Sequence, residues 1–362
     1  MIGRNEVVQA LDADLAALAH GRQRWLRDDV LGLLLHWGMR TSPPYTDVRA
    51  WEDRVTADGW TPGHWVDRAV QLHAGYLVFA SFHSRLGYVR AWPSEIPGSP
   101  VTRRDFLGEL ISAAASRGLK VLLYMTDDPK WHDEDGLGSL DSAAYSAYKD
   151  RPVDLTTRDG FGEFAADNFA EVMRRHPDLA GFWIDKENAH WRRTGLYDRI
   201  RAERPGWILA CNDPDLPSAD TAMDVVCPGV TTDVPLPRVT ESSFTVGGGW
   251  WYDGSDPEVD HVRIIRRIVA NAGSSTKSLL GFGSRHDGRF TPNQEAFCDF
   301  AAAHLDGIGE SPGGTEDFFL DTLSRSEERP GPTTARTPSG TASPHPAASE
   351  FTPHHSSEGT SS

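Results

Sequence analysis

Short apolar runs that end abruptly in polar or aromatic residues recur along this chain of 362 residues. In the segment 179–188, which reads LAGFWIDKEN, the apolar run stops at Asp185. Similar runs cover residues 30–36, 76–82 and 120–125. Continuously apolar strands are typical of a parallel sheet that is buried on both faces. The runs therefore predict parallel strands whose carboxyl ends bring polar side chains to one edge of the sheet.

Amphipathic segments separate these runs and predict helices between the strands. The expected helices cover residues 61–72, 105–117, 161–175, 259–272 and 293–305. Weaker apolar runs indicate four further strands, at 208–211, 222–226, 241–246 and 278–282. About eight alternations of strand and helix predict an α/β fold, a closed (β/α)8 barrel of the TIM type in which the later strands are irregular.

Changes in composition divide the chain into three parts. Residues 1–27 carry valine and leucine at helical spacing and predict a helix that packs on the barrel. The barrel itself is expected to cover residues 28–321. Ser, Thr, Pro and His dominate residues 322–362, and so few apolar residues cannot offset the chain entropy that folding would cost. We therefore expect a disordered tail there.

Charge and cysteine content limit the classes of partner. The formal net charge is 36 − 52 = −16, which disfavours nucleic acid because phosphates require a basic surface. The three cysteines have no metal-binding spacing, so we expect neither a metal site nor another cofactor. No signal peptide and no membrane-spanning run are recognisable, which predicts a cytoplasmic protein without a membrane partner. The sequence gives no indication of the oligomeric state.

Four of the predicted strands deliver side chains that can bind a ligand or react. His36, His83, Tyr124 and Asp185 each lie at the carboxyl end of a strand. In (β/α)8 barrels the catalytic groups come from this end of several different strands. The four residues are therefore expected to face one site. Taken alone, Asp185 is better explained as a helix cap or as the partner of an arginine, and each histidine can be a core residue.

Three motifs occur in order at the predicted strand ends. The first strand runs into His-Trp-Gly at 36–38, the third covers Gly-Leu-Lys-Val-Leu-Leu-Tyr-Met-Thr at 118–126, and the fourth ends in Phe-Trp-Ile-Asp at 182–185. This series resembles the α-L-fucosidases of glycoside hydrolase family 29 over about residues 28–310. The family's counterparts of the second and third motifs are Gly-Leu-Lys-x-Gly-x-Tyr-x-Ser and Leu-Trp-Phe-Asp, and the aspartate of the latter is the family's nucleophile. The resemblance implies a retaining glycosidase that works without metal.

Two carboxyl groups carry the implied mechanism. One attacks the anomeric carbon, and the other, about 5–5.5 Å away, first donates and then accepts a proton. Asp185 takes the place of the nucleophile. Glu241 precedes Gly-Trp-Trp-Tyr at 249–252 by eight residues, as the acid/base does in one branch of the family, and its aromatic neighbours favour a raised pKa. Glu187, two residues after Asp185, is the alternative acid/base.

Aromatic and imidazole side chains near the strand ends are the expected substrate contacts. A sugar packs its C–H face on an aromatic ring, and its hydroxyl groups bind polar side chains. The predicted substrate-binding residues are His36, Trp37, His83, Tyr124, Trp183 and Trp250. The expected partner is a small carbohydrate or glycoside with a terminal α-L-fucosyl or related sugar.

Several positions depart from the family pattern. Phe82 stands where the family has the first histidine of a pair, and Ser84 stands where it has an aspartate. Lys186 replaces the small residue that usually follows the nucleophile, and we expect no counterpart of the family's C-terminal β-sandwich. These departures favour two alternatives: a glycosidase for another deoxy or hexosyl sugar on an intracellular glycoside, and a non-catalytic sugar-binding pseudoenzyme.

Overall fold

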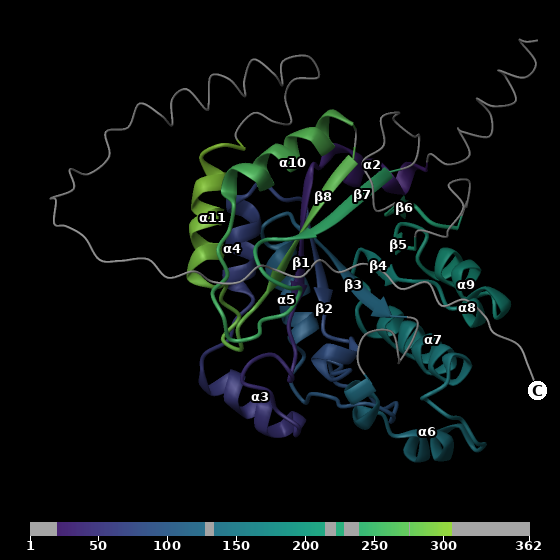
Figure 1. The fold of residues 1–362 in the computed structure, drawn as a ribbon. Coiled ribbons are helices and arrows are strands. Elements are labelled where there is room, and N and C mark those ends of the chain that lie inside the picture. Colours follow the sequence, from purple (N-terminus) through teal and green to yellow (C-terminus); the bar gives the residue numbers. More distant parts are fainter. Residues whose placement is uncertain (1–19, 127–133, 214–221, 228–238, 275, 306–362) are drawn as a thin grey trace, which may run out of the picture. The chain divides into compact units, whose positions relative to one another are not determined.

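Eight parallel strands close into a barrel in the structure, which is a computed structural model (Figure 1). The described residues are 20–126, 134–213, 222–227, 239–274 and 276–305. The strands are β1 (Leu31–His36), β2 (Tyr76–Ala80), β3 (Lys120–Thr126), β4 (Gly181–Asp185), β5 (Ile208–Asn212), β6 (Val225–Val226), β7 (Val239–Thr245) and β8 (Thr276–Gly283). They pair in chain order, and β8 pairs with β1. The predicted (β/α)8 barrel is confirmed, and the irregularity expected of the later strands is clearest in the two-residue β6.

Helices surround the barrel. They are α2 (Arg24–Asp28), α3 (Val48–Ala57), α4 (Gly63–Gln71), α5 (Phe106–Ala115), α6 (Ser142–Lys149), α7 (Arg158–Arg175), α8 (Ala189–Arg193), α9 (Leu196–Glu203), α10 (His261–Gly273) and α11 (Pro292–Ala302). Short 3-10 turns are η1 (Gly21–Gln23), η2 (Ser84–Leu86) and η3 (Glu134–Ser139). In the view of Figure 1, α4, α10 and α11 lie on one side of the strands and α7, α8 and α9 on the other. The five predicted helices correspond to α4, α5, α7, α10 and α11.

Glycine at the start of β4 allows that strand to lie close to β5. A Cβ atom at Gly181 would approach the carbonyl oxygen of Ile208 to 2.0 Å, and its φ of +147° is a conformation that other residues rarely adopt. From there the register runs to the pairing of Asp185 with Asn212, the last residues of the two strands. The backbone thus brings two polar side chains to the carboxyl edge of the barrel.

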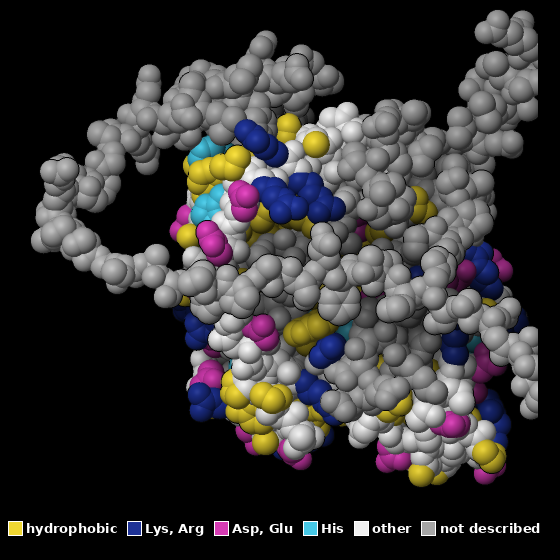
Figure 2. Space-filling model, in the orientation of Figure 1, with side chains coloured by type: hydrophobic (Ala, Val, Ile, Leu, Met, Phe, Trp, Pro, Cys, Tyr) yellow, Lys and Arg dark blue, Asp and Glu magenta, His cyan; other side chains and the backbone are white. Residues whose placement is uncertain are grey.

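Helix α10 illustrates how the helices cover the barrel. Ile264, Ile265 and Ile268 are buried, whereas Arg263, Arg266 and Arg267 are exposed. This is the pattern of an amphipathic helix with one apolar stripe. Figure 2 shows Lys and Arg side chains gathered where α10 lies. A chain with a net charge of −16 therefore still carries a local basic surface.

Some of the predictions fall on other parts of the chain. Residues 1–19, which make up most of the predicted N-terminal helix, and residues 322–362, the predicted tail, lie outside the described residues. The proposed division at residues 27 and 321 therefore stays a prediction. Within the described ranges, no helix has both the length and the apolar character needed to cross a membrane.

Candidate active site

The residues predicted at the strand ends meet at the carboxyl end of the barrel. His36 ends β1, Asp185 ends β4, Tyr124 lies near the end of β3, and His83 follows β2. Ring centroids are 6.4 Å apart for His36 and His83, and 5.7 Å apart for His83 and Tyr124. The Tyr124 hydroxyl donates a hydrogen bond to Asp185 Oδ2 at 2.7 Å. We call this group, together with the residues added in the next two paragraphs, the rim cluster.

Asp185 is held by a second donor that sequence reasoning did not select. Asn212 Nδ2 donates to Asp185 Oδ1 at 2.9 Å, so each carboxylate oxygen accepts a hydrogen bond from a neutral group. Asp185 remains only half-buried. The signal that could have identified Asn212 is its position, because it ends a strand just as Asp185 does. Two donors fix the orientation of the carboxylate, and its partial exposure leaves it accessible.

Two tryptophans after β7 complete the rim cluster. The ring of Trp250 lies 5.4 Å from that of His36, and the ring of Trp251 lies 5.9 Å from that of His83. Glycines on β8 make room for them: a Cβ at Gly281 would come within 2.5 Å of the Trp250 ring, and one at Gly283 within 2.4 Å of the Trp251 backbone. The predicted Trp250 therefore joins the cluster, together with Trp251, which was not predicted.

The structure does not bring Trp37 to the rim cluster. Successive side chains of a strand point to opposite faces. The side chain of Trp37 therefore points away from the barrel interior, whereas that of His36 points into it. The Trp37 ring is buried behind the strands, 4.7 Å from Trp51 and 5.0 Å from Trp60. Its Nε1 donates to the carbonyl oxygen of Arg285 at 3.1 Å. These contacts make Trp37 part of an aromatic core between the barrel and its helices.

Glu241 and Trp183 lie inside the barrel, beneath the rim cluster. Glu241 is 1% exposed and is the third residue of β7. Its Oε1 accepts from Trp183 Nε1 at 2.7 Å and from Cys227 Sγ at 3.5 Å, and its Oε2 accepts from the Tyr76 hydroxyl. Burial raises the pKa of Glu241, although these donors oppose the rise. The Trp183 ring stacks on Tyr124 with centroids 5.6 Å apart.

Glu187 turns towards the helices rather than towards the rim cluster. Lys186, between Asp185 and Glu187, has a φ of +67°, so the chain turns sharply after β4. Glu187 Oε2 accepts from Arg192 Nε of α8 at 2.7 Å. Glu187 also contributes to a raised pKa of the buried Tyr197 of α9, where burial is the main cause. Glu241 is connected to the rim cluster through Trp183, which donates to it and stacks on Tyr124, whereas Glu187 pairs with α8.

The two residues that depart from the family pattern have different surroundings. Phe82 is fully buried and its ring stacks on Phe161 with centroids 5.7 Å apart. Ser84 begins η2, and the preceding His83 accepts a hydrogen bond through Nδ1 from the backbone N–H of Arg85 at 3.0 Å. This bond fixes the imidazole of His83 at the rim.

A polar hollow of about 550 Å³ is lined by residues that follow β1, Trp251 and β8 in the chain. Tyr252, which follows Trp251 in the chain, and Tyr45 contribute aromatic walls. Arg285 and Asp287 pair at 3.0 Å in its lining. The hollow thus offers aromatic and charged groups, one of which directly follows Trp251 in the chain. In the described part of the chain, no group of three or more His, Cys, Asp or Glu side chains could hold a metal ion.

Comparisons with known proteins agree on one family. A family model described as alpha-L-fucosidase matches residues 45–310. An α-L-fucosidase isoenzyme from Paenibacillus thiaminolyticus is 19% identical, with a TM-score of 0.61, over 81% of this chain and 77% of that one. The α-L-fucosidase AlfC from Lactobacillus casei, solved with α-L-fucose product, is also 19% identical with a TM-score of 0.61, over 80% of this chain and 100% of that one.

A third similar structure carries a covalent intermediate. It is an α-L-fucosidase from Bacteroides thetaiotaomicron, trapped with 2-fluoro-fucosyl fluoride, and it is 19% identical with a TM-score of 0.54 over 80% of this chain and 76% of that one. No curated protein matches this chain. At these identities the structural likeness shows the shared barrel fold.

Proposed function

The chain belongs to the α-L-fucosidase family and is a glycosidase, and we propose that it removes a terminal α-L-fucosyl or related sugar through a covalent intermediate. One observation carries the proposal. Asp185 ends a barrel strand with both carboxylate oxygens held by neutral donors, beside two histidines and two tryptophans. That is an environment for an ionised nucleophile next to a sugar-binding surface.

Asp185 is the proposed nucleophile. The bonds from Tyr124 and Asn212 fix the carboxylate and stabilise its charge, and half-burial leaves the carboxylate accessible to an anomeric carbon. In the first step a bond forms from a carboxylate oxygen to the anomeric carbon while the bond to the leaving oxygen breaks. In the second step water displaces the carboxylate. The covalent intermediate of the Bacteroides structure supports this chemistry for the family.

The proton donor of the first step stays a prediction. Glu241 and Glu187 are its two candidates from the sequence. Burial raises the pKa of Glu241, which favours the protonated form that an acid requires. Glu187 forms an ion pair with Arg192 of α8 at 2.7 Å, which directs its carboxylate towards the helices rather than towards Asp185. For Glu241, however, both oxygens already serve as acceptors within the barrel.

The proposed sugar contacts are His36, His83, Tyr124, Trp250 and Trp251. The tryptophan rings provide apolar faces for C–H groups or a methyl substituent, and the imidazoles can bind hydroxyl groups. α-L-Fucose in the Lactobacillus casei structure supports a fucosyl substrate. A related deoxy sugar is the second candidate, because Phe82 places an apolar ring in a buried cluster where the family has a histidine.

A panel of 4-nitrophenyl glycosides tests the proposal. The α-L-fucoside or a related deoxy-glycoside should be hydrolysed, and Asp185→Asn should abolish turnover. Incubation with 2-fluoro-fucosyl fluoride, followed by peptide mass spectrometry, should find the label on Asp185. Hydrolysis by Asp185→Asn at the wild-type rate would refute the nucleophile assignment. Binding of a sugar without turnover of any glycoside would support the pseudoenzyme instead.

A further inference from the structure

A continuous series of side-chain contacts connects the barrel interior to Asp185. Glu241 accepts from Trp183 Nε1 at 2.7 Å, Trp183 stacks on Tyr124 with an interplanar angle of 21°, and the Tyr124 hydroxyl donates to Asp185 at 2.7 Å. Tyr76 holds the other oxygen of Glu241 from below. We infer that Glu241 is a positioning residue, which orients the proposed nucleophile through Trp183 and Tyr124. The inference rests on the proposed function.

The position of Glu241 along its strand supports this role. It is the third residue of β7, whereas Asp185 is the last residue of β4. Its hydrogen-bond donor Trp183 lies two residues before Asp185 on the same face of β4, which places Trp183 one side-chain layer deeper in the barrel. Glu241 therefore acts on the layer beneath the reacting carboxylate. With 1% exposure and donors on both oxygens, it has no oxygen directed to a leaving group at the rim.

Burying a carboxyl group in the interior of a barrel costs free energy, so its presence there requires an explanation. Burial of such a group without partners is strongly unfavourable, so the donors Tyr76, Trp183 and Cys227 are necessary for Glu241 to be tolerated. The benefit is a fixed orientation of the Trp183 indole, which a purely apolar neighbour would not impose. Because Tyr124 stacks on this indole, its hydroxyl is held at the distance that orients Asp185. A displacement of about 1 Å in such a group can cost about 10²-fold in rate.

Two substitutions separate positioning from acid catalysis. Glu241→Gln keeps an acceptor for Trp183 Nε1, so a positioning residue should lose less than about 10-fold in kcat. Glu241→Ala should lose about 10²-fold, by the same factor for good and poor leaving groups, with KM little changed. An acid/base residue would behave differently. Both variants would then lose most activity on poor leaving groups, keep it on 2,4-dinitrophenyl glycosides, and be rescued by azide, which replaces water without needing a general base.

Covalent labelling gives a readout that does not require an acid. In 2-fluoro-fucosyl fluoride the Asp185 carboxylate forms a bond to C1 as the C1–F bond breaks, and fluoride leaves without a proton. Positioning predicts that Glu241→Ala is labelled about 10²-fold more slowly than wild type. Trp183→Phe, which keeps an aromatic ring but lacks the N–H donor, should also be labelled more slowly. Wild-type labelling rates in both variants would overturn the inference.

The controls keep this inference distinct from the proposed function. If wild-type protein is neither labelled at Asp185 nor active on any glycoside, the proposed function itself fails. If the wild type is labelled and Glu241→Gln shows azide rescue, only the positioning role fails. Circular dichroism and urea unfolding identify any variant that does not fold. Should Glu241→Ala be one of these, Glu241→Gln and Trp183→Phe still decide the question.

Discussion

The two ends of the barrel hold their carboxylates in different ways. At the carboxyl end, Asp185 is stabilised by the neutral donors Tyr124 and Asn212. At the amino end, Asp29 has a pKa raised to about 6 by burial, and the nearby positive charge of Lys277 offsets part of this rise. The pKa of Lys277 is itself lowered to about 8 by burial. The carboxylate of Asp185 is thus accessible to a ligand. At the amino end, burial disfavours the charged forms of both Asp29 and Lys277.

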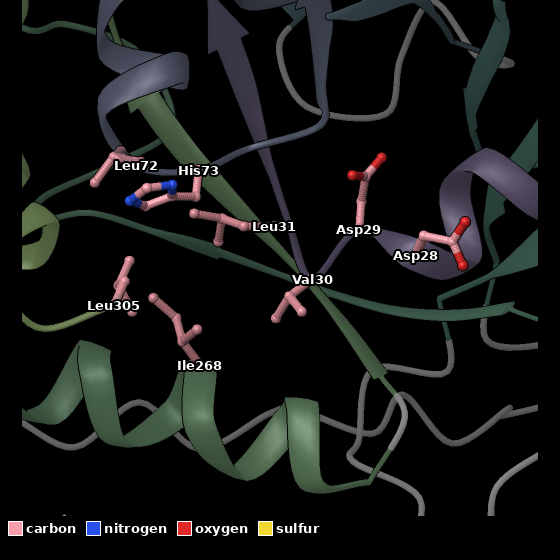
Figure 3. Close-up of a pocket in the computed structure, with 8 residues that line it drawn as sticks. All are labelled: Asp28, Asp29, Val30, Leu31, Leu72, His73, Ile268 and Leu305. Atoms are coloured by element: carbon pink, nitrogen blue, oxygen red, sulfur yellow. The ribbon is translucent and has the colours of Figure 1, made fainter. Parts of the chain in front are cut away.

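The surroundings of Asp29 are typical of a region that stabilises the fold rather than of a site that binds a ligand. A hollow of about 140 Å³ lies there, formed by the start of β1, the end of α4 and the middle of α10. In Figure 3 the side chains of Leu31, Ile268 and Leu305 lie to one side of Val30, and Asp29 lies to the other. Mostly apolar walls and the lack of an aromatic surface for sugar distinguish this hollow from the rim. In barrels, the amino end serves stability and the carboxyl end serves function.

The largest expected effect is at the rim. Asp185→Asn removes the nucleophilic charge while it keeps the size of the side chain, so kcat on the preferred glycoside should fall by at least about 10³-fold. The urea midpoint should change little, because the side chain is half-buried and bonded to neutral groups. The matched control is Asp29→Asn at the other end of the barrel, which should keep full activity. Equal losses of activity in both variants would contradict the assignment of function to the carboxyl end and of stability to the amino end.

A smaller effect is expected when only the support of Asp185 is removed. Tyr124→Phe keeps the ring that stacks on Trp183 but loses the hydroxyl that donates to Asp185. A hydrogen bond to a charged group contributes about 1.5–3 kcal/mol, so kcat should fall roughly 10- to 100-fold. Steady-state kinetics measure it, with the exposed Tyr148→Phe on α6 as the control. An unchanged kcat would show that Asn212 alone orients the carboxylate.

The strand ends explain how much of the site could be predicted. A run of apolar residues that stops at a polar one is a local pattern. It predicted His36, Tyr124 and Asp185 at one edge of the barrel, where the structure has them. The direction of a side chain also follows from alternation along a strand. Trp37 next to His36 could therefore have been assigned to the opposite face from the sequence alone. The motif His-Trp-Gly drew attention to both residues without distinguishing their faces.

Depth inside the barrel is harder to predict than direction. Whether Glu241 lies at the rim or beneath it depends on where β7 begins and on the stagger between strands, which long-range pairing determines. The sequence placed the start of this strand at residue 241, whereas β7 begins at Val239. Asn212 was missed for a related reason, because an amide is an unremarkable residue until its neighbour across the sheet is known. Contacts between strands carried the missing information.

The amino end predicts a dependence of stability on pH rather than of activity. The pKa of Asp29 is raised in the folded protein, so the unfolded chain ionises first, and stability should fall as the pH rises from about 4 through 6. Asp29→Asn cannot ionise and should lack this part of the fall. Between pH 4.5 and 7.5, the change in unfolding free energy should differ from wild type by about 1 kcal/mol, after allowance for the partial exposure of Asp29. Urea unfolding at the two pH values measures the difference, and parallel pH profiles would contradict the assignment.

The smallest effect is expected at the polar hollow of about 550 Å³, whose lining includes Tyr252, the residue that follows Trp251 in the chain. If the leaving group of a glycoside occupies this hollow, Tyr252→Ala removes one aromatic wall, and a sugar leaving group should lose about 2- to 5-fold in kcat/KM. A 4-nitrophenyl leaving group needs less binding and should lose less, so the ratio of the two activities is the measurement. Tyr252→Phe keeps the wall and serves as the control. Equal losses on both substrates would mean that Tyr252 supports Trp251 and the sugar itself, which would extend the functional rim as far as the lining of the hollow.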